Sequence, residues 1–156
     1  MILDERLEFA DAASVAASAG TALIGDVIDL EAAGELAGNQ SGLYLVIQTS
    51  TEIITGGSAG TIYFQLASDA QAAIATDASA TIHATSATLT TDDSAANSDA
   101  LNAGGTILVV ELPRGATYER YLGILCTIGT TTVTAGNINA FLTRDPPSWA
   151  AMPNGI

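Results

Sequence analysis

Few side chains of this sequence have the chemistry of a catalytic site. His83 is the one histidine and Cys126 the one cysteine among 156 residues. A nucleophilic triad needs a histidine beside a serine or cysteine, and an acid that orients the ring. Cys126 belongs to the alternating apolar series of residues 122–128, and such surroundings raise the pKa of a thiol and shield it from substrate. We therefore expect structural roles for both residues, and no enzymatic activity.

No motif of another enzyme class occurs in the context that its chemistry needs. Residues 56–60 read Gly-Gly-Ser-Ala-Gly, but no Lys-Ser or Lys-Thr follows them, as it does in a phosphate-binding loop. Their position between two strand-like segments predicts a hairpin loop. The same five residues fit the letters of G-x-S-x-G, but a nucleophile elbow lies between a strand and a helix and not between two strands. One cysteine cannot form an internal disulfide or a multi-cysteine zinc site. A hydrolase is thus the least favoured interpretation, and we expect no cofactor.

Three aspartates could together form a cation site: Asp92, Asp93 and Asp99. Calcium binds six to eight oxygen atoms, which flexible loops often supply. The spacing differs from that of an EF-hand, so a solvated acidic loop is the simpler interpretation and these residues are weak metal candidates. The alternative function that they support is a carbohydrate-binding or calcium-dependent β-sandwich adhesion module.

The charge of the chain excludes two classes of partner. Seventeen acidic residues face four basic ones, which gives a net charge of −13, and the sequence contains no lysine. The four cations are Arg6, Arg114, Arg120 and Arg144. A nucleic acid needs many basic side chains to neutralise its phosphates, and an anionic membrane repels an acidic protein. We therefore expect neither partner.

Alternation of apolar and polar residues predicts β-strands in most of the chain. In one segment, Ile62, Phe64 and Leu66 share a face, as in a half-buried antiparallel strand. Four segments have this pattern: 43–49, 61–66, 121–128 and 137–143. Such strands, separated by glycine-rich turns, predict an all-β protein, an antiparallel sandwich or barrel.

Other segments give less regular patterns. Residues 106–112 are apolar on both faces as far as Glu111, which predicts a central or doubly covered strand. Residues 81–90 predict a weaker strand, rich in threonine and alanine. Short helical segments are predicted for Leu30–Leu36 and Ser68–Ala75.

The length of the chain predicts one domain over residues 1–156. Residues 1–20 form either a docking arm with apolar anchors or a first strand. Residues 145–156 form a proline-rich tail, which cannot continue a central strand because proline lacks the N–H donor. The first residues lack a basic start followed by an apolar run, so we expect no signal peptide and synthesis in the cytoplasm.

Aromatic and aliphatic residues also occur on the strand faces opposite the expected core. If they are adjacent in space, they form a patch that marks an oligomer or partner surface. The interface candidates, with the anchors of both terminal segments, are Leu3, Leu7, Phe9, Tyr44, Tyr63, Tyr121, Leu125, Phe141 and Trp149.

Four stretches of the sequence resemble a known family. The opening Met-Ile-Leu-Asp-Glu-Arg-Leu-Glu-Phe-Ala-Asp-Ala is similar to the start of tailed-phage capsid cement (decoration) proteins of the Bordetella-phage type. Residues 112–122, Leu-Pro-Arg-Gly-Ala-Thr-Tyr-Glu-Arg-Tyr-Leu, and residues 134–143 resemble the same family, as does the proline-rich tail.

The resemblance implies a jelly-roll sandwich and a non-enzymatic structural role in the virion. Such a protein assembles as a symmetric homo-oligomer, a dimer or trimer, on the outer surface of an icosahedral capsid. There it bridges subunits of the major capsid protein. Arg120 and Tyr121 carry over only as structural or interface residues. The acidic charge agrees with the outer position, since packed DNA repels an acidic protein.

Overall fold

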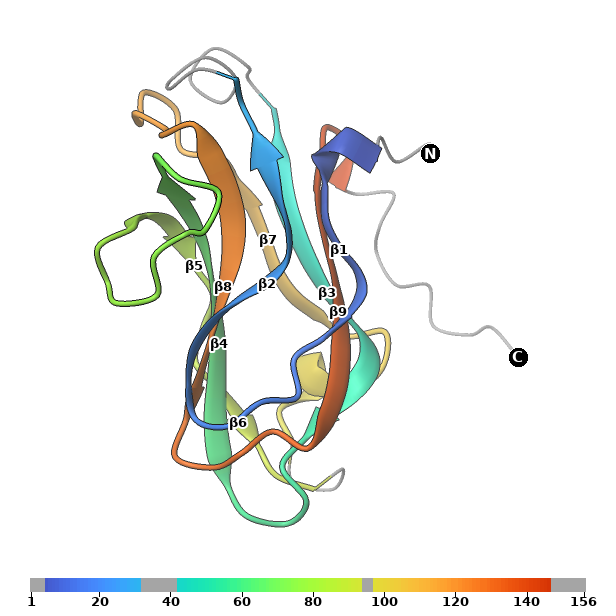
Figure 1. Cartoon of the computed structure of the whole chain (residues 1–156). Coiled ribbons are helices and arrows are strands. Elements are labelled where there is room, and N and C mark those ends of the chain that lie inside the picture. Colours follow the sequence, from blue (N-terminus) through green and yellow to red (C-terminus); the bar gives the residue numbers. More distant parts are fainter. Residues whose placement is uncertain (1–4, 32–41, 94–96, 147–156) are drawn as a thin grey trace.

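The computed structural model describes residues 5–31, 42–93 and 97–146, which form an all-β protein (Figure 1). The only helices among these residues are two short 3-10 turns, η1 (Glu5–Leu7) and η2 (Asp99–Leu101). The strands are β1 (Glu8–Ser14), β2 (Gly20–Asp29), β3 (Tyr44–Ile54), β4 (Gly60–Asp69), β5 (Thr81–Thr85), β6 (Leu89–Thr91), β7 (Thr106–Glu111), β8 (Tyr121–Gly129) and β9 (Ala135–Thr143).

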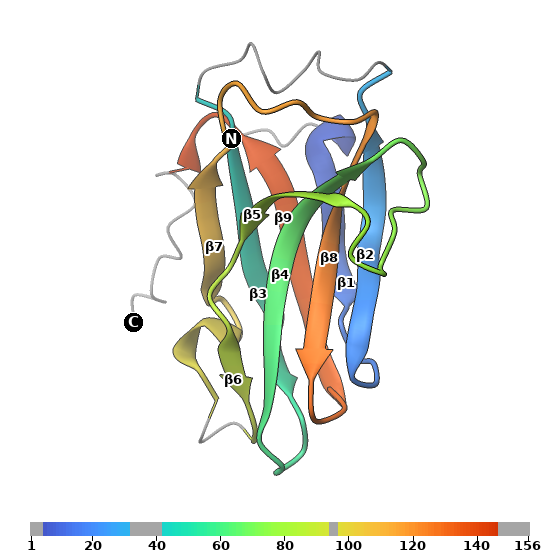
Figure 2. The same ribbon diagram turned by 90° about the vertical axis from the view of Figure 1, so that its left-hand side faces the viewer.

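The strands form two antiparallel sheets that pack face to face (Figure 2). The four-stranded sheet has the order β1-β9-β3-β7, and the five-stranded sheet has the order β2-β8-β4-β5, with β6 also paired to β4. With β5 and β6 sharing one position, this is the jelly-roll arrangement of two Greek keys. The predicted antiparallel sandwich of jelly-roll type is confirmed.

The core lies between the sheets and contains the residues that the alternation assigns to it. Ile62, Phe64 and Leu66 on β4 are fully buried, and Leu45 and Ile47 on β3 face them from the other sheet. Burial of one such side chain contributes about 1.5–3 kcal/mol relative to exposure. The inward faces predicted for β3, β4, β8 and β9 are therefore correct.

Three local predictions are wrong. Residues 55–59 do not form a hairpin loop, because β3 and β4 lie in different sheets and the loop crosses between them. Residues 81–90 form two strands rather than one, since Ser86 interrupts them: its Oγ accepts a hydrogen bond from the Phe64 N–H. Residues 106–111 form β7, which pairs only with β3 among the described strands and is therefore an edge strand.

The helix predicted over Ser68–Ala75 is also wrong. Its first two residues end β4, and the Asp69 carboxylate then accepts hydrogen bonds from the N–H groups of Gln71 and Ala75. These bonds replace those of a helix with a loop held by one side chain. Residues 32–36 of the other predicted helix lie outside the described part of the chain, whereas Leu30 and Glu31 are not helical.

Gly25 allows the two sheets to meet along one side of the sandwich, where β1 lies close to β2. The register of β2 with β8 shifts between Ile24 and Ile28, and Gly25 has a φ of +68°. A Cβ atom at this position would overlap the carbonyl oxygen of Phe9 on β1. The absence of a side chain is therefore what permits this close approach.

Substitution of Gly25 by alanine should destabilise the protein strongly. We expect Gly25→Ala to lower the free energy of unfolding by about 2 kcal/mol or more, because backbone strain and steric overlap combine. The matched control is Gly115→Ala, since Gly115 has a φ of +74° and open space around it. The control should lose only about 1 kcal/mol. Urea unfolding measures both values, and equal losses would contradict the role given to Phe9.

Candidate docking surfaces

The structure separates the interface candidates rather than forming one patch from them. Tyr63, Tyr121 and Leu125 lie on the outer face of the five-stranded sheet, and Tyr44 and Phe141 lie on the opposite side of the molecule, on the four-stranded sheet. Phe9 is 1% exposed in the core, and Leu7 is half-buried against it, so Phe9 offers no surface to a partner. Leu3 and Trp149 lie outside the described residues.

A loop, residues 70–80, covers part of the outer face of the five-stranded sheet. Ile74 anchors this loop and is 4% exposed, in a small apolar cluster with Ala67, Ala80 and Leu125. The Ile74 side chain lies over Gly123 of β8: a Cβ added at Gly123 would fall 2.6 Å from the Ile74 Cδ1 atom. Gly123 thus provides the space that lets the loop dock on the sheet.

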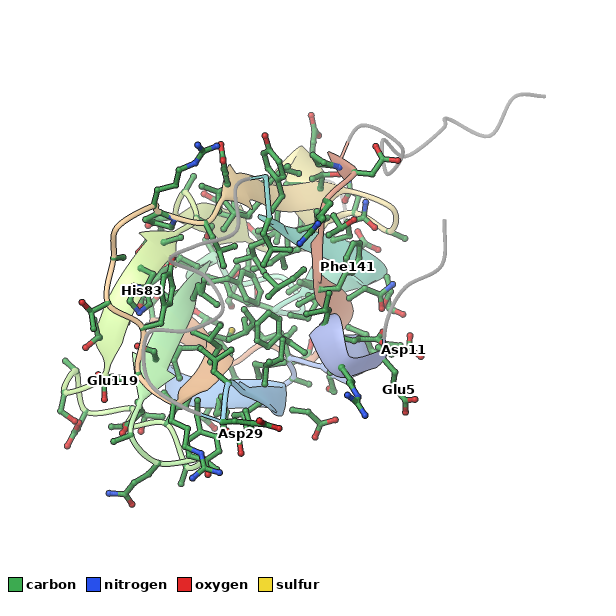
Figure 3. The ribbon with its side chains drawn as sticks, turned by 90° about the horizontal axis from the view of Figure 1, so that it is seen from above. Glu5, Asp11, Asp29, His83, Glu119 and Phe141 are labelled. Atoms are coloured by element: carbon green, nitrogen blue, oxygen red, sulfur yellow. The ribbon has the colours of Figure 1, made fainter. Side chains whose placement is uncertain are left out.

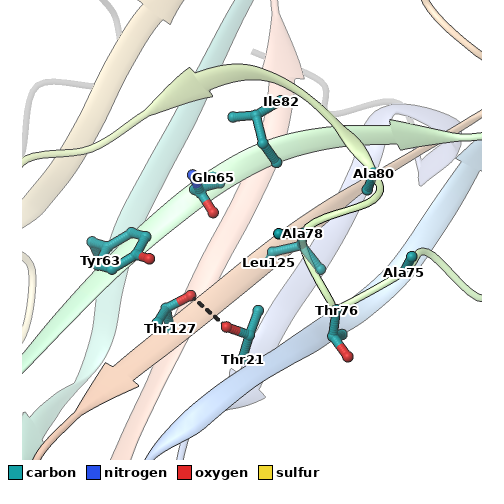
Figure 4. Close-up of a pocket in the computed structure, with 10 residues that line it drawn as sticks. All are labelled: Thr21, Tyr63, Gln65, Ala75, Thr76, Ala78, Ala80, Ile82, Leu125 and Thr127. Carbon is teal, nitrogen blue, oxygen red and sulfur yellow. Dashed lines mark hydrogen bonds between the residues drawn. The ribbon is translucent and has the colours of Figure 1, made fainter.

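Beside this loop the sheet has a shallow hollow of about 220 Å³ (Figure 4). A hydrogen bond of 2.9 Å joins the hydroxyls of Thr21 and Thr127 in its wall, and Tyr63 and Gln65 come from β4. Ile82 of β5 lines it and is 40% exposed. No lining residue carries a charge. The hollow is a neutral, partly apolar surface on a strongly acidic chain.

A second hollow, of about 470 Å³, lies at the side where β1 and β2 meet and is acidic. Two of its acidic residues, Glu5 and Asp29, are labelled in Figure 3. Its charged lining residues are Glu5, Arg6, Glu8, Asp26, Asp29 and Glu31. The Asp29 carboxylate accepts two hydrogen bonds of 2.8 Å from the Arg120 guanidinium. These bonds lower the pKa of Asp29 and raise that of Arg120. This side of the protein favours basic partners and repels acidic ones.

The outer face of the four-stranded sheet carries a row of apolar side chains. Val46 pairs with Phe141 on one side and with Val109 on the other. Val46 and Phe141 are only 0% and 2% exposed, although the alternation turns both away from the core. Val109, at the outer edge of the row, is 47% exposed. The accessible apolar surface on this face therefore lies at β7.

His83 takes part in a hydrogen-bonded group that the sequence reasoning missed. Its Nε2 lies 2.8 Å from the Ser68 Oγ, and its ring stacks on that of Tyr118 at 4.2 Å. The Glu119 N–H donates to the same Ser68 Oγ over 3.1 Å. Ser68 is fully buried, so this pair connects β4, β5 and the segment before β8 and offers no nucleophile to a substrate. The sequence did contain a signal for this pair: Ser68 is a polar residue at the next position of the alternating series Ile62, Phe64 and Leu66 on the apolar face of β4.

Neither Cys126 nor the three aspartates form a reactive centre with their neighbours. Cys126 is 1% exposed, and burial raises the pKa of its thiol to about 12. The Asp92 carboxylate accepts the Asp93 N–H, while the Asp92 N–H donates to Asn97. Within residues 5–31, 42–93 and 97–146, no three histidine, cysteine or acidic side chains form a group that could hold a metal ion, and Asp92, Asp93 and Asp99 are included in this statement.

The comparison with protein families identifies the chain. Residues 9–142, almost the whole described sandwich, match the Bbp16 family. The chain belongs to the Bbp16 family. This family name indicates a Bordetella phage protein. No curated protein sequence matches the chain, and no helix among the described residues of this Bbp16-family member is long and apolar enough to cross a membrane.

The contact between Ile74 and Gly123 predicts a local effect of substitution in this Bbp16-family chain. We expect Gly123→Val to displace Ile74 and to speed amide hydrogen exchange in residues 70–80 about tenfold, since about 1.4 kcal/mol of loop contact is lost. In an Ile74→Ala background the same change should have a smaller effect on this loop, because the Ile74 Cδ1 atom is gone and only the contacts with Leu23 and Val27 on β2 remain. If the two substitutions change the exchange rate in a fully additive way, then Ile74 does not occupy the space beside Gly123.

The lowered pKa of His83 predicts that the folded protein loses stability in mild acid. Burial lowers its pKa from the usual value of 6.5, and the charge of Glu119 opposes this only in part. As the pH falls through about 6.5, the unfolded chain takes up a proton that the folded chain binds less readily, so folding weakens. We expect His83→Gln to lose less stability than the natural chain between pH 7.5 and pH 5.5 in urea unfolding. Equal losses would contradict this assignment.

Proposed function

We propose that this chain is a non-enzymatic structural protein of a phage virion. It binds the outer surface of the icosahedral capsid as a symmetric oligomer and stabilises the shell by bridging subunits of the major capsid protein. The observation that carries the proposal is the Bbp16 match across a jelly-roll sandwich. The Ser68–His83 pair supports a structural role, because its hydroxyl is buried beneath the sheet.

The neutral hollow beside loop 70–80 is the surface that meets the capsid. A chain with a net charge of −13 repels acidic surfaces over most of its exterior, whereas this hollow has no charged lining residue. Ile82 and Tyr63 offer apolar area and a phenol group there, the composition typical of interface cores. The acidic hollow at β1 and β2 favours basic groups of the shell around this contact.

Bridging explains how such a protein stabilises a shell without chemistry. A ligand that binds the assembled state, but not its separated subunits, shifts the equilibrium toward assembly by an amount set by its concentration and affinity. The outer position follows from the charge, since the concentrated phosphates of packed DNA repel an acidic protein on the inside.

Capsid binding by defined variants tests this function. Co-sedimentation with purified cognate capsids should show saturable binding of the natural chain. We expect Tyr63→Ala combined with Ile82→Ser to weaken it about tenfold or more, because both side chains line the hollow. The matched control is Thr51→Ala, at an exposed position on β3 of the other sheet.

Two results would overturn parts of this proposal. A folded chain that does not sediment with cognate capsids at any concentration removes the capsid role. Binding that is unchanged in the Tyr63 and Ile82 variant places the contact on another surface. Electron cryomicroscopy of decorated capsids then shows which face of the sandwich touches the shell.

A further inference from the structure

His83 lies at an irregularity of β5, which pairs only with β4 among the described strands. Leu66 pairs with Ala84 and Ala67 pairs with Ile82, so His83 is an extra residue with no partner opposite it on β4. Such a bulge disrupts the ladder locally and redirects a side chain. The His83 ring contacts residues beneath the sheet, whereas the side chain before it lines the neutral hollow outside.

Side-chain contacts support the first half of β5, where the ladder is weak. The His83 Nε2 atom lies 2.8 Å from the Ser68 Oγ, and the ring stacks on the fully buried Tyr118. The Thr81 hydroxyl donates to the Glu119 carboxylate over 2.7 Å. Figure 3 shows His83 and Glu119 on the same side of the sandwich. The segment before β8 and the end of β4 therefore hold Thr81 and His83 in place together.

The hydrogen bonds of Ser68 require a neutral His83 ring. The Ser68 Oγ accepts the Glu119 N–H over 3.1 Å, and His83 is its only other hydrogen-bond partner among the described residues. The single hydroxyl proton is therefore donated to Nε2, which must be the unprotonated nitrogen of the ring. When the ring takes up a proton, Nε2 becomes a donor and the Ser68 proton loses its acceptor. Ser68 is 0% exposed, so bulk water cannot replace this bond while β5 stays in place.

The groups around the ring resist its protonation. Burial lowers the pKa of His83, and the Glu119 carboxylate opposes this only in part. Burial also raises the pKa of Tyr118, which stays neutral. β5 has no other charged residue, and the Asp69 carboxylate at the end of β4 binds N–H groups of the following loop. The Arg120 guanidinium is bound to an aspartate of β2. Glu119 is thus the acid whose charge acts on the ring.

From this arrangement we infer that His83 is a proton-controlled switch for the neutral hollow. Protonation of the ring separates Thr81–His83 from β4 and removes Ile82 from the wall of the hollow, because Ile82 and His83 are adjacent in β5. An edge strand with few contacts can open in this way while the two sheets remain folded. The inference rests on the proposed function in one respect, since it adds control by pH to the proposed capsid contact.

The first experiment follows the switch in the chain alone. His83 is the only histidine, so its ring gives a single NMR titration, which we expect to have a midpoint below pH 6.5. The protection factors of the Thr81–Thr85 amides should fall about tenfold as the ring becomes protonated, since one buried hydrogen bond is lost. Low concentrations of urea should not change this exchange, because opening of β5 alone exposes little surface. Exchange in β9 should rise with urea, as global unfolding does.

Two variants separate a switch from a merely structural contact. His83→Gln provides an oxygen that can accept the Ser68 hydroxyl but does not titrate, so the protection of β5 should change little between pH 7.5 and pH 5.5. Glu119→Gln keeps an oxygen for the Thr81 hydroxyl but removes the charge that favours the protonated ring. In this variant the ring titration and the opening of β5 should move together to lower pH. A structural role alone would leave the coupling between them absent.

Capsid binding tests the control of the contact. Only closed molecules have the complete hollow, so the apparent Kd rises in proportion as the closed fraction falls. The ratio of the Kd at pH 5.5 to that at pH 7.5 should be at least about twofold larger for the natural chain than for His83→Gln, as when half of the molecules are open. Both chains are measured on the same capsids, so titration of the capsid itself affects them equally.

The outcomes separate this inference from the proposed function. A ring that titrates at or above pH 6.5 overturns the inference, as does exchange in β5 that ignores the titration or has the urea dependence of β9. Equal pH dependence of capsid binding in the natural chain and in His83→Gln also overturns it and leaves the capsid role standing. If β5 opens with the titration but the chain never sediments with capsids, the capsid role is wrong and the switch at the hollow stands.

Discussion

The register of four central strands, β3, β9, β4 and β8, is the constraint on which the structure depends. Each remaining strand pairs with one of them, so their inward residues position everything else. A slip of one residue in β4 would turn Ile62, Phe64 and Leu66 toward solvent and would place Tyr63 and Gln65 in the core. The same register therefore fixes the core and the residues of the neutral hollow, because opposite faces of a strand cannot change independently.

The two sides of the sandwich differ in closure and in charge. On one side, Gly25 lets β1 approach β2, and five carboxylates line the hollow there. On the other side, β7 ends the four-stranded sheet with apolar residues and one neutralised glutamate. One group of acidic residues thus lies where the sheets already meet. The neutral and apolar surfaces occur where backbone groups or large apolar side chains are still accessible.

The sequence predicts what alternation controls, but not what distant contacts control. The burial of Leu45, Ile47 and Phe64 follows from their spacing, so the sandwich and its core could be expected. Strand order could not, because nearly all strand partners are far apart in the chain, and an apolar segment such as 106–111 looks the same at an edge as in the centre. The helix over Ser68–Ala75 failed because the Asp69 side chain binds the loop backbone. The pairing of Ser68 with His83 also joins separate strands, and no local pattern shows it.

One part of loop 70–80 is anchored to the sheet, and another part lines the neutral hollow. The loop rests on the five-stranded sheet through Ile74 and through the Asp69 carboxylate, both near its start, while the segment 75–80 lines the hollow without belonging to a strand. Residues at 76 and 78 can therefore change without altering any strand register. Mutations there would reshape the hollow while the sandwich below stays the same, so the proposed capsid contact can change here at little cost to stability.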